Sequence, residues 1–500
     1  MSQLQTVDDV IAIARALPLA NNAFINGRFV AASAGKRLPT HNPATGEHIT
    51  DIAACDVDDV NAAVSAARAA FEAGSWSKRA PGERKAVLLK LAELMEQEVT
   101  QLAVLESLDS GKPVSECLTV DVPETIHVIR WHAEAIDKLY DHTAPVGKGA
   151  MALVVREAIG VVGCVLPWNF PLLMLAWKLG PALAAGCSVI VKPAEQTSLT
   201  ALRVAELAHQ AGVPAGVLNI VTGTGKAVGE PIGLHPDIDM VSFTGSTATG
   251  RRFLHYAAES NLKKVVLECG GKNPALVFAD AEDLASVAGH VLNGAFWNMG
   301  ENCSATSRLL VQDEIKEALL AEMAKQMGDW PMGNPLDPQN RLGSLVSEEH
   351  FSKVSGYLET ARQEGLRIIH GGDTEQGVYV QPTVIDGVTP ASALFREEIF
   401  GPVLCVTSFK TEAEAVALAN DTPYGLAASV YTGKLNRAIR VSRAIRAGTV
   451  TVNCFGEGDA TTPFGGYKQS GFGGRDKSVF ALDQYTELKT IWIDVPTDDA

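Results

Sequence analysis

The segment that decides the fold is VVGCVLPWNFPLLMLAWKLGPALAAGCSVIVKPAEQTS, residues 161–198. It contains two short apolar runs, 161–166 and 188–191, each closely followed by a proline, with a helical pattern at 177–185 between them. Short apolar runs that end at such breakers indicate buried strands. A strand, a helix and a second strand in this order predict a parallel pair joined by a right-handed crossover.

The same alternation continues along the chain. The pattern predicts further strands at 217–221 and 240–244, and helices at 199–210 and 227–234. After Gly271 a second series of strands is predicted at 274–278, 308–311, 367–370, 403–409 and 449–453. Because strands that alternate with helices form parallel sheets covered on both faces, we predict an α/β protein with two doubly wound domains.

The length of 500 residues supports two domains, since a single core rarely exceeds about 250–300 residues. Residues 57–139 are predicted to be largely helical, beginning with Asp56 as cap and Asp59 in the first turn. We assign residues 1–137 and 158–269 to the first domain. Residues 270–480 form the second.

The remaining segments, 138–157 and 481–500, contain strand candidates at 152–155 and 486–493. We predict that they pair as a small protruding sheet that docks on another subunit, giving a homo-oligomer, either a dimer or a tetramer. The alternative is that both are edge strands of the main sheets.

Composition excludes several classes of partner. The net charge of −16 argues against nucleic acid or an anionic membrane as a partner. The start of the chain lacks a signal-peptide pattern, and the longest nearly apolar stretch, 179–191, is too short to span a bilayer. Eight scattered cysteines without a CxxC pair predict reduced thiols in a cytoplasmic protein and no metal site.

Cys303 lies in a polar context, GENCSATSR (300–308), after a glycine-containing turn and near a predicted helix start. Such a setting exposes a thiol and favours the thiolate. Cys164 and Cys405 lie in apolar runs, where a thiol is ordinarily a small hydrophobe, and this is also the alternative for Cys303.

Two more residues could carry chemistry. Glu268 closes the run 264–267 just before Gly270, and a carboxylate in an apolar cleft has a raised pKa that suits a general base. Asn169 stands between two prolines after a strand and could donate its amide to an oxyanion. The alternatives are a helix cap for Glu268 and a turn residue for Asn169.

Polar and glycine-rich turns follow the other strands. The turns at 223–225 and 245–247 could each place a helix N-terminus beside a phosphate, or could be ordinary turns. Lys192 and Glu195 could contact ribose hydroxyls, or could be a solvated loop pair.

Taken together, these stretches resemble the NAD(P)-dependent aldehyde dehydrogenase superfamily, from about residue 20 to the end of the chain. The segments that match, in the family's order, are PWNFP (167–171), KPAEQT (192–197), FTGST (243–247), LECGGKNP (267–274), GENCSA (300–305), EEIFGPV (397–403) and PFGGYKQSG (463–471). The resemblance implies two Rossmann-like domains and a β oligomerisation element. One departure is Cys269, where the family usually has leucine.

The resemblance implies a role for each catalytic candidate. Cys303 is the expected nucleophile, and Glu268 the base that activates the thiol, the hydrolytic water, or both. Asn169 and the backbone N–H of Cys303 form the expected oxyanion hole, and Lys178 matches a proton-relay position. The reaction is expected to pass through a thiohemiacetal and a thioester, and Glu268 favours hydrolysis to the free acid over transfer to coenzyme A.

The resemblance also implies a dinucleotide cofactor. Its expected contacts are Pro167, Trp168, Lys192, Glu195, Gly225, Gly229, Phe243, Gly245, Ser246, Gly270, Glu398 and Phe400. Because the Glu195 carboxylate would repel a 2′-phosphate, we expect NAD, with NADP as the less favoured alternative.

The stretches 131–140, 467–478 and 485–493 resemble bacterial γ-glutamyl-γ-aminobutyraldehyde and 4-guanidinobutyraldehyde dehydrogenases. The expected substrate residues are Asp121, Phe170, Met174, Trp177, Trp297, Cys454, Phe455, Glu457 and Asp459. The three acids would attract a cationic tail, and the absence of arginine disfavours anionic aldehydes. The alternative is that these acids are solvated loop charges.

The predicted function is therefore NAD-dependent oxidation of an aliphatic ω-amino, ω-guanidino or γ-glutamylamino aldehyde to its acid, as in polyamine catabolism. The alternatives are a broad-specificity aldehyde dehydrogenase, a cofactor-independent cysteine esterase, and a non-catalytic binding protein. Reduction of NAD on addition of an aldehyde separates the dehydrogenases from the other two classes.

Overall fold

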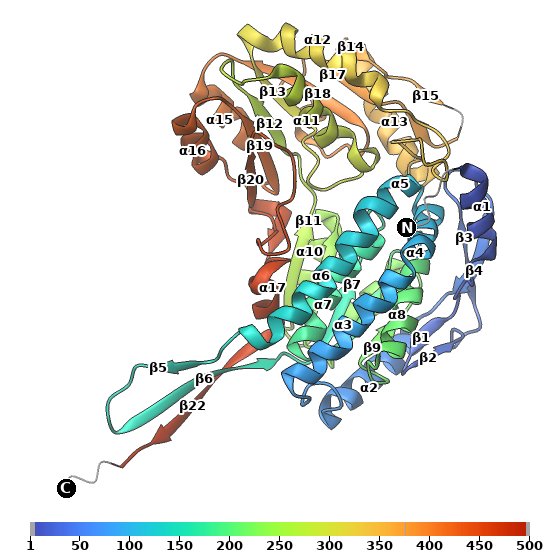
Figure 1. Ribbon diagram of the computed structural model, residues 1–500, viewed down its shortest axis with the longest axis vertical. Coiled ribbons are helices and arrows are strands. Elements are labelled where there is room, and N and C mark those ends of the chain that lie inside the picture. Colours follow the sequence, from blue (N-terminus) through green and yellow to red (C-terminus); the bar gives the residue numbers. More distant parts are fainter. Residues whose placement is uncertain (1–5, 376, 497–500) are drawn as a thin grey trace.

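The computed structural model describes residues 6–375 and 377–496. They form two α/β domains, each built on its own sheet, and an arm of three strands that projects from the first domain (Figure 1). The predicted fold class is therefore confirmed. Among the described residues, no helix combines the length and apolar character needed to cross a bilayer.

The first domain is built on an eight-stranded sheet of order β2-β1-β9-β8-β7-β10-β11-β21. Its five central strands, β9, β8, β7, β10 and β11, are parallel, as predicted for buried apolar runs. The strands are β1 (Ala23–Ile25), β2 (Arg28–Val30), β7 (Val161–Val165), β8 (Ser188–Lys192), β9 (Leu218–Ile220), β10 (Met240–Gly245), β11 (Lys264–Cys269) and β21 (Gly471–Phe472). A separate hairpin pairs β3 (Arg37–His41) with β4 (His48–Ala53).

Helices pack on this sheet and around it (Figure 1). They are α1 (Val7–Ala16), α2 (Val57–Ala73), α3 (Pro81–Gln97), α4 (Val99–Ser110), α5 (Val114–Glu116), α6 (Val122–Ala135), α7 (Pro171–Ala185), α8 (Leu199–Ala211), α9 (Glu230–Leu234), α10 (Thr247–Glu259) and α17 (Ser478–Gln484). The predicted cap at Asp56 is confirmed as a capping box with Asp59.

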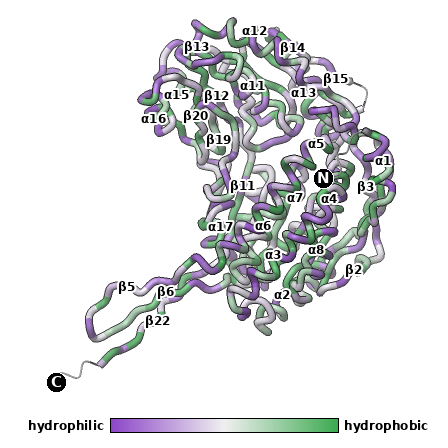
Figure 2. The backbone as a smooth tube through the Cα atoms, viewed as in Figure 1, coloured by the Kyte–Doolittle hydropathy of each residue, from purple (hydrophilic) through white to green (hydrophobic). Residues whose placement is uncertain are grey.

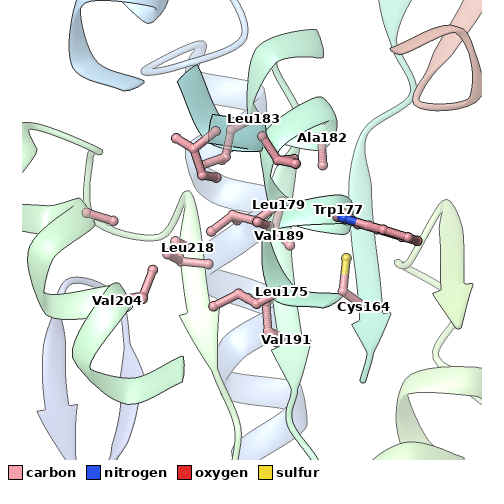
Figure 3. Packing of buried hydrophobic residues seen from close by; sticks show 14 of the residues in the cluster. Cys164, Leu175, Trp177, Leu179, Ala182, Leu183, Val189, Val191, Val204 and Leu218 are labelled. Atoms are coloured by element: carbon pink, nitrogen blue, oxygen red, sulfur yellow. The ribbon is translucent and has the colours of Figure 1, made fainter. Parts of the chain in front are cut away.

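Helix α7 is the centre of the first core. It begins at Pro171, before the predicted start at residue 177, because proline suits the first turn, where an N–H has no partner in the helix. Leu175 and Leu179 pack against Val189 of β8 and its neighbours, whereas Trp177 points to the side where Cys164 lies (Figure 3). The helix thus anchors both the sheet and the residues that follow β7.

The second domain has a seven-stranded sheet of order β14-β17-β18-β13-β12-β19-β20. Its strands are β12 (Pro274–Val277), β13 (Arg308–Gln312), β14 (Arg367–His370), β17 (Thr383–Asp386), β18 (Val403–Phe409), β19 (Ala427–Tyr431) and β20 (Thr449–Val452), with β15 (Thr374–Glu375) and β16 (Tyr379–Val380) as a separate pair. Its helices are α11 (Leu284–Phe296), α12 (Lys316–Gln326), α13 (Glu348–Gln363), α14 (Ala393–Arg396), α15 (Glu412–Asn420) and α16 (Leu435–Ala444). The sequence pattern missed β17 and β19.

The chain returns to the first domain earlier than predicted. Strand β21 pairs with β11, and Phe464, Leu482 and Tyr485 join the first core. The predicted end of the second domain at residue 480 is therefore wrong, because the segment from about Ala460 onward already packs on the first domain.

The arm consists of β5 (His142–Ala144), β6 (Ala150–Ala158) and β22 (Thr486–Asp494). The predicted pairing of the two segments is confirmed: β22 lies antiparallel to β6 from Thr486 opposite Ala158 to Asp494 opposite Ala150. The alternative, edge strands of the main sheets, is wrong. Hydrophobic residues are interspersed with hydrophilic ones along the arm (Figure 2). Residues 1–5 and 497–500 of the predicted segments lie outside the described residues.

Candidate active site

Cys303 lies in a loop that connects the 3-10 turn η4 (Trp297–Gly300) to β13. No helix begins there, so the predicted helix start is wrong. The loop is held by Asn273, whose Nδ2 donates to the carbonyl oxygens of Cys303 (2.7 Å) and Ala305 (3.0 Å). The nucleophile candidate is thus fixed through its backbone, and its thiol stays half-buried and accessible.

The environment of Cys303 favours the thiol over the thiolate. Burial raises its pKa well above the ordinary value, and the nearby carboxylates of Glu457, Glu398 and Glu268 raise it further. Negative neighbours and a low-dielectric setting both disfavour a second negative charge. The setting therefore favours the thiol over the expected thiolate, and a base that takes its proton assists the reaction.

Glu268 lies near the end of β11 and is 3% exposed. A Cβ on Gly465 would come within 2.5 Å of its Oε1, so the glycine permits this close approach. Within residues 6–375 and 377–496 it forms no ion pair. Burial raises its pKa well above the ordinary value, and the charge of Asp476 adds to this effect. A carboxyl group with a raised pKa suits proton transfer.

Lys178 forms a fully buried ion pair with Asp476, with Nζ and Oδ2 2.6 Å apart. Asp476, but not Lys178, is among the residues that line the cavity beside Cys303 described below. The pair influences Glu268 in opposite directions, since Lys178 lowers its pKa and Asp476 raises it. Sequence reasoning missed Asp476, because an acid in a glycine-rich stretch gives no sign that it meets a lysine almost three hundred residues away.

Cys303, Glu268 and Asn169 line one cavity of about 170 Å³, here called the inner cavity. They come from three distant parts of the chain that the two domains bring together. The other residues of its wall are Pro167, Trp168, Met174, Trp177, Thr244, Gly245, Ser246, Cys269, Gly270, His350, Lys353, Glu398, Phe400, Phe464 and Asp476.

The Asn169 side chain is oriented by the loop that carries Cys303. Its Nδ2 donates to the carbonyl oxygen of Glu301 at 2.9 Å, and Asn298 donates to the same oxygen at 2.9 Å. The Asn298 amide also donates to the Asn169 carbonyl at 3.1 Å. Because a primary amide has two N–H groups, one remains for an oxyanion that forms beside Cys303.

Most of the predicted cofactor contacts nearest to Cys303 share its cavity: Pro167, Trp168, Gly245, Ser246, Gly270, Glu398 and Phe400. Glu398 accepts from the Gly271 N–H at 2.8 Å, and burial raises its pKa to about 7. The ring of Trp168 makes edge contacts with His350 (5.0 Å) and Phe400 (5.3 Å). His350 Nε2 donates to the Phe400 carbonyl oxygen at 2.7 Å, and this residue had no signal in the sequence.

The remaining predicted cofactor residues lie outside this wall. Lys192 ends β8, and its Nζ lies 2.8 Å from Glu195 Oε2. At Gly225 and Gly229 an added Cβ would meet no atom within 4 Å, which leaves open space beside the turn. Phe243 is buried in β10 and packs on Phe253, so it supports the site from behind.

This arrangement fits a dinucleotide. Ser246 caps the N-terminus of α10 beside the inner cavity, where backbone N–H groups suit a phosphate. The Glu195 and Glu398 carboxylates suit ribose hydroxyls. The chain can therefore hold a dinucleotide along the carboxyl ends of its parallel strands, the usual place for such a ligand.

A second cavity of about 580 Å³, here called the outer cavity, adjoins the inner cavity at Trp177, which lines both. Of the predicted substrate residues, Trp297, Phe455 and Glu457 line it, and Met174 lines the inner cavity. Phe170 packs on Trp297 with ring centroids 5.2 Å apart. Both cavities therefore have aromatic walls, and Cys303 lines the inner one.

Several substrate predictions need correction. Asp121 is buried and pairs with Lys112 at 2.5 Å, so it does not stand at an open entrance. Cys454 and Asp459 are exposed and are not part of the outer cavity wall. The polar wall consists instead of Glu116, Thr119, Glu124, His127, Asn293, Glu457 and Lys477. Of the three acids predicted there, Glu457 lines the outer cavity, and Lys477 adds a cation that was not predicted.

Comparison with known proteins agrees with this geometry. The model of the aldehyde dehydrogenase family matches residues 29–491. The aminoacetaldehyde dehydrogenase of Pseudomonas aeruginosa is 68% identical over 99% of this chain and 100% of that protein. The crystal structure of γ-glutamyl-γ-aminobutyraldehyde dehydrogenase from Burkholderia cenocepacia has a TM-score of 0.96 and 48% identity, over 98% of this chain and 100% of that chain. P. syringae indole-3-acetaldehyde dehydrogenase AldA, solved with NAD+ and IAA, has a TM-score of 0.97 and 47% identity, over the same shares. The chain therefore belongs to the aldehyde dehydrogenase family.

Proposed function

We propose that this enzyme uses NAD to oxidise an aliphatic aldehyde with an ω-amino, ω-guanidino or γ-glutamylamino tail to the carboxylic acid. The observation that supports the chemistry is that the thiol of Cys303, the carboxyl group of Glu268 and the amide of Asn169 line the same inner cavity. The relatives named for aminoacetaldehyde and γ-glutamyl-γ-aminobutyraldehyde support the substrate class. A cytoplasmic location stays a prediction from composition.

The first step is attack of Cys303 Sγ on the aldehyde carbon. Glu268 as carboxylate takes the thiol proton, and a C–S bond forms while the carbonyl electrons move to oxygen. The second N–H of Asn169 and the backbone N–H of Cys303 donate to this oxyanion. Lys178 and Asp476 act through Glu268, since their paired charges set how readily it holds a proton.

NAD held beside Gly245, Ser246 and Glu398 would supply the hydride acceptor needed to convert the thiohemiacetal into a thioester. Glu268 releases the thiol proton to solvent, and its carboxylate then removes a proton from water, whose oxygen attacks the thioester carbon. The C–S bond breaks, Cys303 leaves as thiolate, and the carboxylic acid is released. Splitting the oxidation into a covalent stage and a hydrolytic stage lowers the barrier of each.

An aldehyde panel tests the proposal. NADH formation is measured with aminoacetaldehyde, 3-aminopropanal, 4-guanidinobutanal, propanal and hexanal, with NAD and with NADP. We expect higher kcat/KM for the cationic aldehydes than for propanal, because acids predominate in the outer cavity. Equal kcat/KM across the panel favours the broad-specificity alternative, and absence of NADH with every aldehyde rejects the proposal.

The preference for NAD is expected to depend on Glu195. Its carboxylate accepts hydrogen bonds from ribose hydroxyls and repels a 2′-phosphate. Glu195→Gln should therefore lower the ratio of kcat/KM with NAD to kcat/KM with NADP by about tenfold, which corresponds to about 1.4 kcal/mol. Lys192, its partner at 2.8 Å, stays available for either cofactor. An unchanged ratio in the Gln variant would contradict this role.

The arm supports a homo-oligomer. On β22 the side chains of Leu488 and Trp492 are 67% and 63% exposed, and Ile491 and Ile493 are 40% and 42% exposed. Large apolar side chains on an exposed strand are usually covered by another chain. Light scattering should give a mass of two or four times 52.9 kDa, and Trp492→Asp should lower it. A monomer at micromolar concentration would rule out this assembly.

A further inference from the structure

Lys477 has an unusual place for a lysine. It precedes α17, is only 2% exposed and has a φ of 61°, in the left-handed region. Its Nζ donates to the Glu457 carbonyl at 2.9 Å and lies over the rings of Trp177 and Phe464, 5.1 and 5.6 Å from their centroids. Because ring faces attract cations, these contacts fix the ammonium in the cavity wall.

Lys477 lies beside both cavities. Lys477 lines the outer cavity, and its two aromatic neighbours, Trp177 and Phe464, line the inner cavity. Of the residues that form the outer cavity wall, it is the one lysine, and none is arginine. The structure therefore places one fixed positive charge at the junction between the two cavities.

Burial lowers the pKa of Lys477, and the nearby carboxylates of Glu457, Glu124, Asp459 and Asp476 raise it. Within residues 6–375 and 377–496, none of these acids forms an ion pair with its ammonium. Glu116 accepts from Trp297 Nε1 at 3.0 Å, and Glu457 accepts from Ser304 Oγ. Glu124 remains as a half-buried acid of the outer cavity. One Lys477 N–H is used by a backbone carbonyl, and an ammonium has three. Donors thus remain for a group that enters the cavity.

We propose that Lys477 is a specificity-determining residue that gives a carboxylate on the substrate tail a partner. The outer cavity then offers Lys477 to a carboxylate and Glu124 to an ammonium, and so fits aldehydes whose tails carry both groups. This inference rests on the proposed function and deepens it. A cavity lined only by acids would repel every anionic tail. With Lys477 in the wall, the cavity instead distinguishes substrates by where their tails carry charge.

The test compares kcat/KM for succinic semialdehyde, propanal and 3-aminopropanal, which carry an anionic, a neutral and a cationic tail. Lys477→Met keeps the length of the side chain and removes its charge. We expect the ratio of succinic semialdehyde to propanal to fall about tenfold, and the ratio of 3-aminopropanal to propanal to rise. Lys477→Arg should keep both ratios near those of the wild type, because it retains the charge.

Two further variants complete the experiment. Glu124→Gln should change the ratios in the opposite direction. Relative to propanal, kcat/KM should rise for succinic semialdehyde and fall for 3-aminopropanal. Lys325→Met removes an exposed lysine on α12, paired with Glu322, and should change neither ratio. It controls for net charge.

An equal change in kcat/KM for all three substrates in Lys477→Met would overturn the proposal, because a residue that only supports the loop has no preference for the charge of the substrate. If that variant does not fold, unchanged ratios in Glu124→Gln overturn it instead. These outcomes differ from failure of the proposed function, in which the wild-type enzyme forms no NADH with any of the aldehydes.

Discussion

Cys303→Ala should reduce aldehyde-dependent NADH formation by about 10⁴-fold or more in kcat, because removing a nucleophile removes the covalent stage of the reaction. Direct hydride loss from an uncharged aldehyde has no oxyanion to drive it. The other cysteine of the inner cavity, Cys269, does not replace it, since Cys269 is buried and burial raises its pKa to about 12.

The measurement is steady-state NADH absorbance, with NAD binding followed by calorimetry on the same protein. We expect NAD binding to be retained, since Asn273 anchors the loop through the backbone carbonyl of Cys303, which alanine keeps. Cys454→Ala is the matched control, because Cys454 is exposed and lies outside both cavity walls. NADH formation at the wild-type rate in Cys303→Ala would contradict the proposed chemistry.

The sequence predicted the buried parts of the fold best. Strands β7, β8 and β10 are buried on both faces and therefore appear as continuous apolar runs that end in glycine or proline. Strand β3, RLPTH, has mostly exposed or half-buried residues and a proline, so it carries no such signal. The return of β21 to β11 is a pairing across two hundred residues, which no local pattern encodes.

The candidate site shows the same division. Cys303, Glu268 and Asn169 lie in motifs and were found from the sequence. His350, Lys353 and Asp476 belong to the same wall only because of long-range packing. Asp121 shows the limit most clearly: sequence cannot distinguish a solvated acid from one that is buried against Lys112. The sequence shows that a residue is charged, but not which distant residue it pairs with in the fold.

Glu268→Gln should lower kcat by about 10²–10³-fold, within the range that general-base catalysis contributes. Glutamine keeps the shape of the side chain in its tight place beside Gly465 but cannot accept a proton. The raised pKa of Cys303 makes this loss severe, because neither the thiol nor water gives up its proton readily without a base. Glu259→Gln, an exposed change on α10, is the control and should have no effect.

The pH profile separates this role from a structural one. Burial and Asp476 raise the pKa of Glu268, so its basic form appears only above the ordinary carboxyl range. The wild-type rate should therefore rise with pH through that raised pKa and level off above it. In Glu268→Gln this rise should disappear, and the residual rate should follow hydroxide or the Cys303 thiol at higher pH. Persistence of the wild-type rise in the Gln variant would show that another group is the base, and Asp476, on the same wall, would be the next residue to replace.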